Sequence, residues 1–260
     1  MTDNDMREGI SERAQRIAGR LLEARRGGPP LSAGGEDAQG LTRGETYAVQ
    51  ALVAQEHGHA GGFKVACKPG APQIMAPIFS DDIIDSPAQL PVPEGERIGV
   101  ELELGFRVIA PLPAADAPNR SARLAECLEL VPVIEIIRTR LDAEDVPPLI
   151  KLADNQINGG LVVGSGLRDW RHLDLSGAHA RLDLGGQTIL DGRAEVPGGD
   201  AFANFQALEA MVGDHCGGLH PGHVVITGSL NGLPYITAPC KIEGRIGGLG
   251  EVALDLVVLA

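Results

Sequence analysis

Hydrophobic residues near the start of the chain recur every three or four positions. Ala14, Ile17 and Leu21 follow this spacing with charged residues between them, which predicts an amphipathic helix over residues 6–26. A second helix is predicted over residues 42–58, because it begins with a threonine and has a glutamate three positions later, a typical capping box. The chain is therefore expected to begin with two helices.

Beyond Gly62 the hydrophobic pattern shortens to runs that are bounded by Pro, Gly or Asp and are typical of β-strands. One further helix interrupts these runs, because Asp200 is a suitable N-cap and Phe205 and Leu208 share a helical face. The predicted strands cover residues 63–66, 73–79, 97–110, 130–137, 181–184, 188–190 and 223–227, and more lie within 240–259. The two strands within 181–190 are expected to form a hairpin around a pair of glycines.

The order of these elements indicates an α+β fold. Helices that are segregated from runs of strands favour an α+β arrangement or a β-roll over a doubly wound parallel sheet. We divide the chain into an N-terminal helical portion at residues 1–60 and a β-roll domain at residues 61–260. The two are expected to form one continuous unit.

Composition and charge narrow the choice of partners and compartment. The 35 acidic and 22 basic residues give a formal net charge of −13, which repels a phosphate backbone, so we expect no nucleic-acid partner. No stretch approaches the ~20 apolar residues of a membrane span, and the first residues lack the apolar core of a signal peptide. The four cysteines are scattered, as is typical of thiols in a reducing compartment. We therefore expect a cytoplasmic protein without membrane contacts.

Two carboxylates are predicted to stand side by side on one strand. Successive side chains of a strand point to opposite faces, so Glu101 and Glu103 share one face while Leu102 points to the other. Like charges at this spacing repel each other unless a cation lies between them or one of them is protonated. An isolated pair of this kind is also typical of a solvated strand face.

A third carboxylate, Glu135, interrupts the otherwise apolar residues 131–137. An unpaired carboxylate in a buried strand is costly, so Glu135 requires a partner, either a metal ion or an arginine such as Arg138 or Arg140. Three oxygen ligands without converging His or Cys suit a hard cation such as Mg²⁺ or Mn²⁺. The residues alone leave a metal site and a set of solvated or ion-paired carboxylates as open alternatives.

Lys64 alternates with two apolar neighbours on the first predicted strand. One interpretation is a surface lysine whose stem covers apolar surface. Beside a metal-bound carbonyl, its ammonium would instead stabilise negative charge or, with a lowered pKa, move a proton.

Taken together, these segments resemble the 2-keto-4-pentenoate hydratase and 4-oxalocrotonate decarboxylase branch of the fumarylacetoacetate hydrolase superfamily. Their order and approximate spacing match the family over most of the chain. The matching segments are residues 62–65 (GFKV), 101–103 (ELE), 134–136 (IEI) with Arg140, 153–159 (ADNQING), 222–229 (GHVVITGS) and 247–250 (GGLG). The resemblance implies a mixed β-sandwich roll with an N-terminal helical portion. It also implies a Mg²⁺ or Mn²⁺ ion held by Glu101, Glu103 and Glu135.

The resemblance further implies a metal-dependent lyase in the catabolism of aromatic compounds. Such relatives chelate the carboxylate and 2-oxo oxygens of a small 2-oxo acid, so that negative charge can develop at C3. Hydratases then add water to a 2-hydroxydienoate or 2-oxo-enoate. The alternatives are a decarboxylase of the 4-oxalocrotonate type, or a catalytically weak homologue that binds a ligand or serves as a partner subunit. A homo-oligomer is expected, as is an association with another enzyme of the pathway.

The resemblance also implies roles for individual residues. Lys64 and Asp154 are the implied catalytic residues. Asn155, Thr227 and Ser229 are expected to lie near the substrate. Turn chemistry explains Asp154 and Asn155 equally well, and a strand-to-turn transition explains the segment from Thr227 to Ser229 equally well.

Three positions depart from the pattern of the family. Ile74 lies in a stretch that carries an aspartate in relatives, Gly99 stands where an arginine is common, and Ile157 stands where a serine is common. Water addition needs a positioned water and a proton donor as well as a chelating metal, so these changes leave hydration and decarboxylation open. Asp81 and Asp82 are candidates to compensate, although a Ser-Asp-Asp turn is also typical of simple capping.

Overall fold

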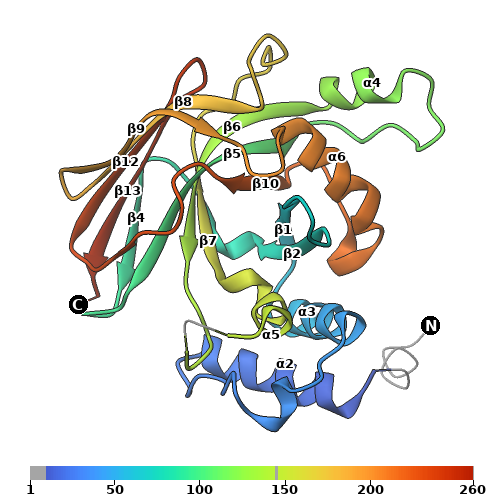
Figure 1. Cartoon of the computed structure of the whole chain (residues 1–260), viewed down its shortest axis with the longest axis vertical. Helices are drawn as coiled ribbons and strands as arrows, with labels where there is room; N and C mark the ends of the chain where they lie inside the picture. The colour runs from blue at the N-terminus through green and yellow to red at the C-terminus, as the bar shows by residue number, and fades with distance from the viewer. Residues whose placement is uncertain (1–9, 144–145, 260) are drawn as a thin grey trace.

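The computed structural model describes residues 10–143 and 146–259 (Figure 1). An N-terminal pair of helices lies beside two β-sheets, and a short helix, α5 (Pro148–Ala153), packs against this pair. Residues 6–9 of the first predicted helix lie outside the described part. Within the described residues, no helix has both the length and the apolar character that crossing a membrane requires.

The N-terminal pair consists of α2 (Glu12–Arg25) and α3 (Arg43–His57). Thr42 and Glu45 form the predicted capping box at the start of α3. Glu45 also forms an ion pair with Arg13 of α2 at 2.6 Å. The cap of one helix thus also ties it to the other, and the two predicted helices are confirmed.

The larger sheet is mixed. Among the described residues it has eight strands, in the order β2-β1-β10-β5-β6-β7-β3 with β11 beside β5. β1 and β10 are parallel, whereas β5 and β6 are antiparallel. The strands are β1 (Ala60–Ala66), β2 (Ile74–Phe79), β3 (Ile83–Asp85), β5 (Ile98–Val108), β6 (Leu128–Ile137), β7 (Asn158–Val163), β10 (Val224–Ser229) and β11 (Tyr235–Ile236).

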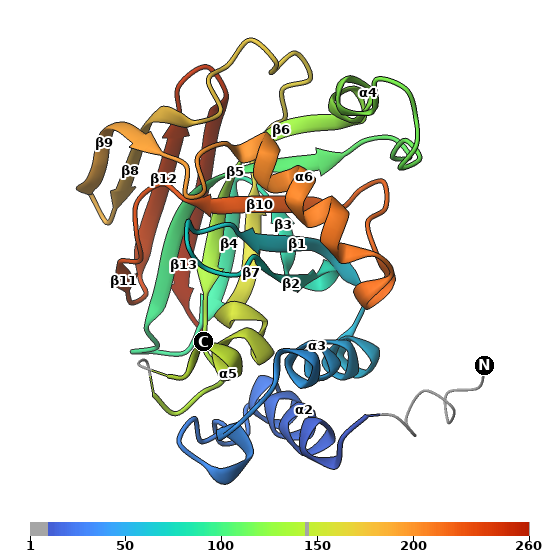
Figure 2. The same cartoon turned by 45° about the vertical axis from the view of Figure 1, so that its right-hand side comes forward.

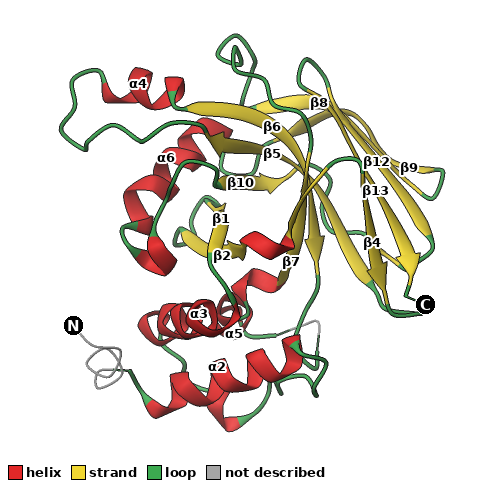
Figure 3. Cartoon of the chain, turned by 180° about the vertical axis from the view of Figure 1, so that it is seen from behind, coloured by secondary structure: helices red, strands yellow, loops and turns green. Residues whose placement is uncertain are grey.

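The second sheet has five strands among the described residues, in the order β4-β13-β12-β8-β9 (Figure 3). The predicted hairpin is β8 and β9, and the segment 240–259 forms a second hairpin from β12 and β13. The bounds are β4 (Ala88–Val92), β8 (Gly177–Leu184), β9 (Gln187–Glu195), β12 (Cys240–Ile246) and β13 (Gly250–Val258).

One face of the larger sheet is covered by the second sheet and by α6 (Ala201–Val212) (Figure 2). Leu102 of β5 shares a buried hydrophobic cluster with Leu254 of the second sheet. Further along the same face, Phe106 contacts Phe205 of α6, with ring centroids 5.5 Å apart. The chain therefore forms the predicted α+β fold, a mixed β-sandwich roll with N-terminal helices.

Several short elements are not evident from the sequence. They include α4 (Arg120–Glu126), α5, and the strands β3, β4 and β7. Each is too short, or too uniformly buried, to show a clear period of hydrophobic positions. They matter here because α5 and β7 flank the segment 154–157, which reaches the site described next.

The other face of the larger sheet carries the acidic residues. In the antiparallel register of β5 and β6, Glu101 lies directly opposite Glu135. Lys64 of β1 pairs with Ile226 of β10, which in turn pairs with β5. A Cβ atom at Gly62 would overlap the carbonyl oxygen of Val224, so only glycine lets β1 and β10 approach this closely.

Candidate metal centre

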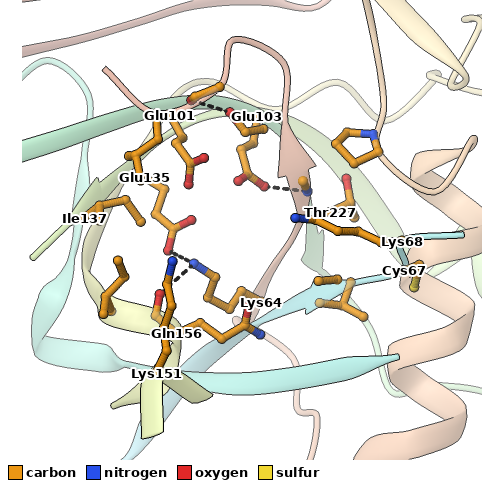
Figure 4. Close-up of a pocket in the computed structure, with 18 residues that line it drawn as sticks. Lys64, Cys67, Lys68, Glu101, Glu103, Glu135, Ile137, Lys151, Gln156 and Thr227 are labelled. Atoms are coloured by element: carbon orange, nitrogen blue, oxygen red, sulfur yellow. Dashed lines mark hydrogen bonds and ion pairs between the residues drawn. The ribbon is translucent and has the colours of Figure 1, made fainter. Parts of the chain in front are cut away.

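Three glutamates converge on one point inside a cavity of about 420 Å³ (Figure 4). Each of Glu101, Glu103 and Glu135 offers one carboxylate oxygen, and these oxygens all lie within 4.8 Å of one another. Glu103 and Glu135 are buried, whereas Glu101 is partly exposed. Alternation along β5 and the register with β6 together produce this arrangement, as the spacing predicts.

Hydrogen bonds hold two of the three carboxylates. The backbone N–H of Gly228 donates to Oε2 of Glu103 at 2.7 Å. Lys64 donates from Nζ to Oε1 of Glu135 at 2.5 Å, and Asn158 donates from Nδ2 to the same oxygen at 2.7 Å. Gly228 has a φ of +121°, a conformation that favours glycine.

The surroundings of the second carboxylate oxygen of Glu135 bear on whether the three glutamates can hold a cation. Oε2 of Glu135 is buried and has no hydrogen-bond donor among the described residues. A buried carboxylate oxygen without a partner is costly, and a cation is the partner that a cluster of three carboxylates requires. All three groups are hard oxygen donors, so the residues present fit Mg²⁺ or Mn²⁺.

The electrostatics of the cluster also favour the binding of a cation. Burial and the charge of Glu135 raise the pKa of Glu101 to about 7. The same two causes raise the pKa of Glu103 well above its usual value. Burial would lower the pKa of Lys64, but the charges of Glu135, Glu101 and Glu103 outweigh it and raise this pKa. In the metal-free cluster Lys64 is therefore a charged ammonium rather than a neutral amine.

The metal-free protein is expected to lose stability as the pH rises from about 5 to about 8. The raised pKa values of Glu101 and Glu103 mean that the folded protein keeps protons that the unfolded chain has already released, so the free energy of unfolding falls as the pH rises. For Glu101, whose pKa moves from 4.5 to about 7, the loss is on the order of 3 kcal/mol and is complete at about pH 8.

Urea denaturation at several pH values, with EDTA and with saturating Mg²⁺, measures this effect. Because other titrating groups contribute equally to both series, the difference between the series isolates the cluster. We expect Mg²⁺ to remove most of the pH dependence and Glu103→Gln to reduce it in EDTA. Two parallel curves would contradict the prediction.

Two other predicted residues line the cavity. Thr227 is buried, and its hydroxyl donates to the carbonyl oxygen of Leu104 at 2.8 Å. Ser229 also lines the cavity, and its hydroxyl donates to the carbonyl oxygen of Gly232 at 2.9 Å. The structure thus brings Thr227 and Ser229 to the three glutamates and Lys64, while their contact with a substrate stays a prediction.

Asp154 does not line the cavity. Its carboxylate binds Arg140 through both oxygens, at 2.6 Å from Nε and 3.0 Å from the backbone N–H. Arg140 also donates to the carbonyl oxygens of Asp154 and Asn158. The ion pair therefore fixes the ends of the segment between α5 and β7, and a direct catalytic role for Asp154 stays a prediction.

The segment that follows Asp154 is strained. Asn155, Gln156 and Ile157 have φ values of 49°, 51° and 56°, in the left-handed region that is unfavourable for a β-branched residue such as isoleucine. Oδ1 of Asn155 and Nε2 of Gln156 are buried and have no hydrogen-bond partner among the described residues. Gln156 and Ile157 line the cavity, whereas Asn155 is buried and does not line it, so its contact with a substrate stays a prediction. Strain and unpaired polar atoms concentrate at functional sites.

The remaining predicted residues lie elsewhere. Asp81 and Asp82 form the short helix η2 (Ser80–Asp82) and do not line the cavity. Asp82 instead lies 4.0 Å from His57 at the end of α3. Their proposed compensating role thus gains no support from their position.

One of the unusual positions, Gly99, has a steric reason, and another, Ile157, changes the cavity wall. A Cβ atom at Gly99 would lie 2.6 Å from Leu233 and 2.8 Å from Ile137, which both line the cavity, so an arginine would not fit there without displacing them. Ile157 contributes an apolar side chain to the wall. These positions therefore make the cavity wall more apolar than the family pattern predicts.

Lys68, Lys151 and Asn158 were not identified from the sequence. Asn158 lies inside the motif at residues 153–159 and donates to Glu135, so the motif itself is its signal. Lys68 follows β1 in a loop and Lys151 lies in the short helix α5, and both line the cavity. No hydrophobic period or motif distinguishes these two lysines.

Comparisons with known proteins agree with this geometry. No family model matches the chain. It is 22% identical over 256 residues to the 2-keto-4-pentenoate hydratase of Paraburkholderia xenovorans (strain LB400), covering 94% of this chain and 95% of the relative. The identity and coverage are the same for 2-keto-4-pentenoate hydratase 3 of Pseudomonas putida.

Solved structures show the same fold. The 4-oxalocrotonate decarboxylase of Pseudomonas putida G7, complexed with magnesium and adipate, has a TM-score of 0.75 at 17% identity, over 96% of this chain and 98% of its own. The fumarylpyruvate hydrolase of Pseudomonas aeruginosa, in complex with Mn²⁺ and pyruvate, has a TM-score of 0.53 at 15% identity, over 75% and 88%.

The fold and the carboxylate cluster together match what the resemblance to the fumarylacetoacetate hydrolase superfamily implies. Over most of its length the chain is similar in sequence to the 2-keto-4-pentenoate hydratases and in fold to the 4-oxalocrotonate decarboxylase, as the motifs predict.

Proposed function

We propose that the chain is a metal-dependent lyase that adds water to a 2-hydroxydienoate or 2-oxo-enoate. The observation that carries this proposal is the convergence of three carboxylate oxygens within 4.8 Å, beside an ammonium, in one cavity. Similarity to the 2-keto-4-pentenoate hydratases over 94% of the chain supports the reaction type.

In this proposal Glu101, Glu103 and Glu135 hold Mg²⁺ or Mn²⁺. When bound, the ion would act as a Lewis acid on the carboxylate and 2-oxo oxygens of the substrate. Lys64 presents Nζ to the same region and would stabilise negative charge on a substrate oxygen or move a proton there. Thr227 and Ser229 would shape the opposite wall.

Decarboxylation of a 4-oxalocrotonate-type substrate is the second candidate. The fold matches a 4-oxalocrotonate decarboxylase over nearly the whole of both chains. The cavity wall also carries Ile137 and Ile157, and apolar side chains suit loss of CO₂ better than the placement of a water. The expected homo-oligomer, its association with another enzyme and its cytoplasmic location stay predictions.

The assay follows the ultraviolet absorbance of 2-hydroxypenta-2,4-dienoate with metal-loaded protein. We expect consumption that depends on Mg²⁺ or Mn²⁺, and a loss of about 10²-fold or more in kcat/KM, with weaker metal binding, in Glu101→Gln. Glu243→Gln, an exposed glutamate that is ion-paired with Lys241 in the second sheet, is the matched control.

A second assay measures CO₂ release from 4-oxalocrotonate and decides between the two reactions. Turnover of neither substrate by metal-loaded protein, together with unchanged metal affinity in Glu101→Gln, would contradict the enzyme proposal. That result would favour the catalytically weak homologue.

A further inference from the structure

A second cavity lies apart from the metal centre, where the end of α2 meets the larger sheet. Its volume is about 620 Å³, which falls within the range of small-molecule sites. Its wall is built mainly from the ends of α2 and α3 and from the segments that follow β4 and β6. Among the described residues, none lines both this cavity and the metal cavity. It is therefore a separate candidate binding site.

Arg25, in the last turn of α2, brings a positive charge to this cavity without a counter-ion. Its Nε atom is buried and has no hydrogen-bond partner, and no carboxylate among the described residues forms an ion pair with its guanidinium. The other buried side-chain atoms without a partner belong to Glu135, Asn155 and Gln156, at or beside the metal centre. Away from that centre, Arg25 is the only described residue with such an atom.

The surroundings of Arg25 disfavour its charge. Burial and the charge of Arg140 lower the pKa of Arg25 to about 9. One contact compensates in part, because the guanidinium carbon lies 5.0 Å from the centroid of the Phe79 ring, a cation–π arrangement. The terminal carbonyl oxygens of α2 accept hydrogen bonds from the backbone N–H groups of residues 26–28 rather than from this side chain. A charge in such a place is stabilised by an anion.

The other charged groups of the wall leave Arg25 without a counter-ion. Two ion pairs use the remaining arginines, Arg138 with Glu96 at 2.5 Å and Arg140 with Asp154 at 2.6 Å. Two further carboxylates of the wall, Asp82 and Glu94, are open to solvent, which screens their charge; the side chain of Asp82 is 31% exposed and Glu94 is exposed.

Two uncharged groups of the wall suit the oxygens of a bound anion. Thr139 lines the cavity, and its hydroxyl accepts from the backbone N–H of Leu141, which leaves the hydroxyl proton free to donate. His57 also lines the cavity, and burial together with the charge of Arg25 lowers its pKa, so at neutral pH it donates from one ring nitrogen. Arg25, Thr139 and His57 therefore offer hydrogen-bond donors in one cavity.

We propose that this cavity binds a small organic anion through the guanidinium of Arg25, with a carboxylate or a phosphate as the group that is recognised. The inference goes beyond the proposed function and does not depend on it. Because the wall combines the N-terminal helices with segments of the larger sheet, the bound anion would hold the two together.

Calorimetric titration of inorganic phosphate and of succinate into the Mg²⁺-loaded protein tests the proposal and distinguishes the two kinds of anion. We expect at least one of them to bind, and Arg25→Met to weaken that binding about tenfold or more, the typical effect of losing a charge-assisted hydrogen bond. Arg25→Lys should retain part of the affinity, because it keeps the charge but loses the planar fork. Arg20→Met, at an exposed arginine of the same helix, is the matched control.

Glu101→Gln separates this site from the metal centre. Phosphate and carboxylates also bind metal ions, and any binding there should depend on Glu101, which lines the metal cavity. We expect Glu101→Gln to leave the binding that depends on Arg25 unchanged. Conversely, Arg25→Met should leave the affinity of the Mg²⁺-loaded protein for oxalate, a chelating ligand, unchanged.

Thermal unfolding provides a second measurement. A ligand that binds only the folded protein raises its Tm, by about 3 °C or more at ten times the dissociation constant for a chain of this size. We expect this shift in the parent protein and in Arg20→Met, and a much smaller one in Arg25→Met at the same anion concentration.

Three results would overturn the proposal. They are binding of neither anion, equal binding by Arg25→Met and the parent protein, and loss of the binding in Glu101→Gln, which would place the anion at the metal centre. If Arg25→Met fails to fold, the affinity of Arg25→Lys still tests the contact, because an affinity equal to that of the parent protein would contradict recognition by the guanidinium.

Discussion

Replacement of Lys64 by methionine is expected to lower kcat by about 10²–10⁴-fold, the range for removal of a positioned proton donor or of a charge at a developing oxyanion. Lys64 is buried, its ammonium lies 2.5 Å from Glu135, and it faces the same cavity as all three glutamates. Methionine has a similar length and no charge, so it removes the ammonium with little change in packing.

The same substitution is expected to strengthen metal binding. In the metal-free protein the ammonium of Lys64 partly neutralises the carboxylates and therefore competes with a cation for them. Titration with Mn²⁺ should give a higher affinity for Lys64→Met than for the parent protein. A loss of both activity and metal affinity would instead indicate that the variant has disturbed the cluster.

Lys64→Arg separates the two roles of the ammonium. A guanidinium keeps the positive charge but does not release a proton at neutral pH. Partial activity in Lys64→Arg would identify stabilisation of charge as the main contribution, whereas inactivity equal to that of Lys64→Met would identify proton transfer. An activity of Lys64→Met within a few-fold of the parent protein would contradict any catalytic role.

The sequence predicts this site as far as local spacing allows. Alternation on one strand places Glu101 and Glu103 together, and an acidic residue in an apolar run indicates that Glu135 needs a partner. The same reasoning offered Arg138 and Arg140 as partners of Glu135, and the structure pairs them with Glu96 and Asp154 instead. Partner choice depends on strand register and loop path, which no local pattern specifies.

The other two lysines of the cavity show the same limit more strongly. Lys68 and Lys151 are far apart in the sequence, and each lies in or next to a short element with no hydrophobic period. Both line the cavity only because α5 packs against the N-terminal helices while β1 occupies the larger sheet. The fold class follows from the order of helices and strands, but such a combination of loop and helix residues in one cavity depends on the complete tertiary structure.

Asp154→Asn is expected to lower the free energy of unfolding by about 3–5 kcal/mol, the cost of leaving one partner of a buried ion pair without its counter-charge. The side chain of Asp154 is 0% exposed and that of Arg140 is 6% exposed. Asparagine keeps the shape of the aspartate but leaves the guanidinium buried and unpaired. Urea denaturation of the Mg²⁺-loaded protein measures the loss.

The pair of Glu96 and Arg138 is a matched control. It is also an Arg–carboxylate pair, at 2.5 Å, but its side chains are 25% and 41% exposed, so Glu96→Gln should cost only about 0–1 kcal/mol. Arg140→Met should destabilise the protein as Asp154→Asn does, because either change breaks the same buried pair.

The comparison of Asp154→Asn with Arg140→Met also distinguishes a catalytic role of Asp154 from a structural one. If Asp154 transfers a proton, Asp154→Asn would lower kcat without changing stability or metal affinity, and Arg140→Met would not reproduce that loss. If the ion pair instead holds the strained segment 155–157 against the cavity, both variants lose stability together, and any loss of activity follows the displacement of Gln156 and Ile157. Because both carboxylate oxygens of Asp154 are occupied by Arg140 and neither faces the cavity, we expect the second result.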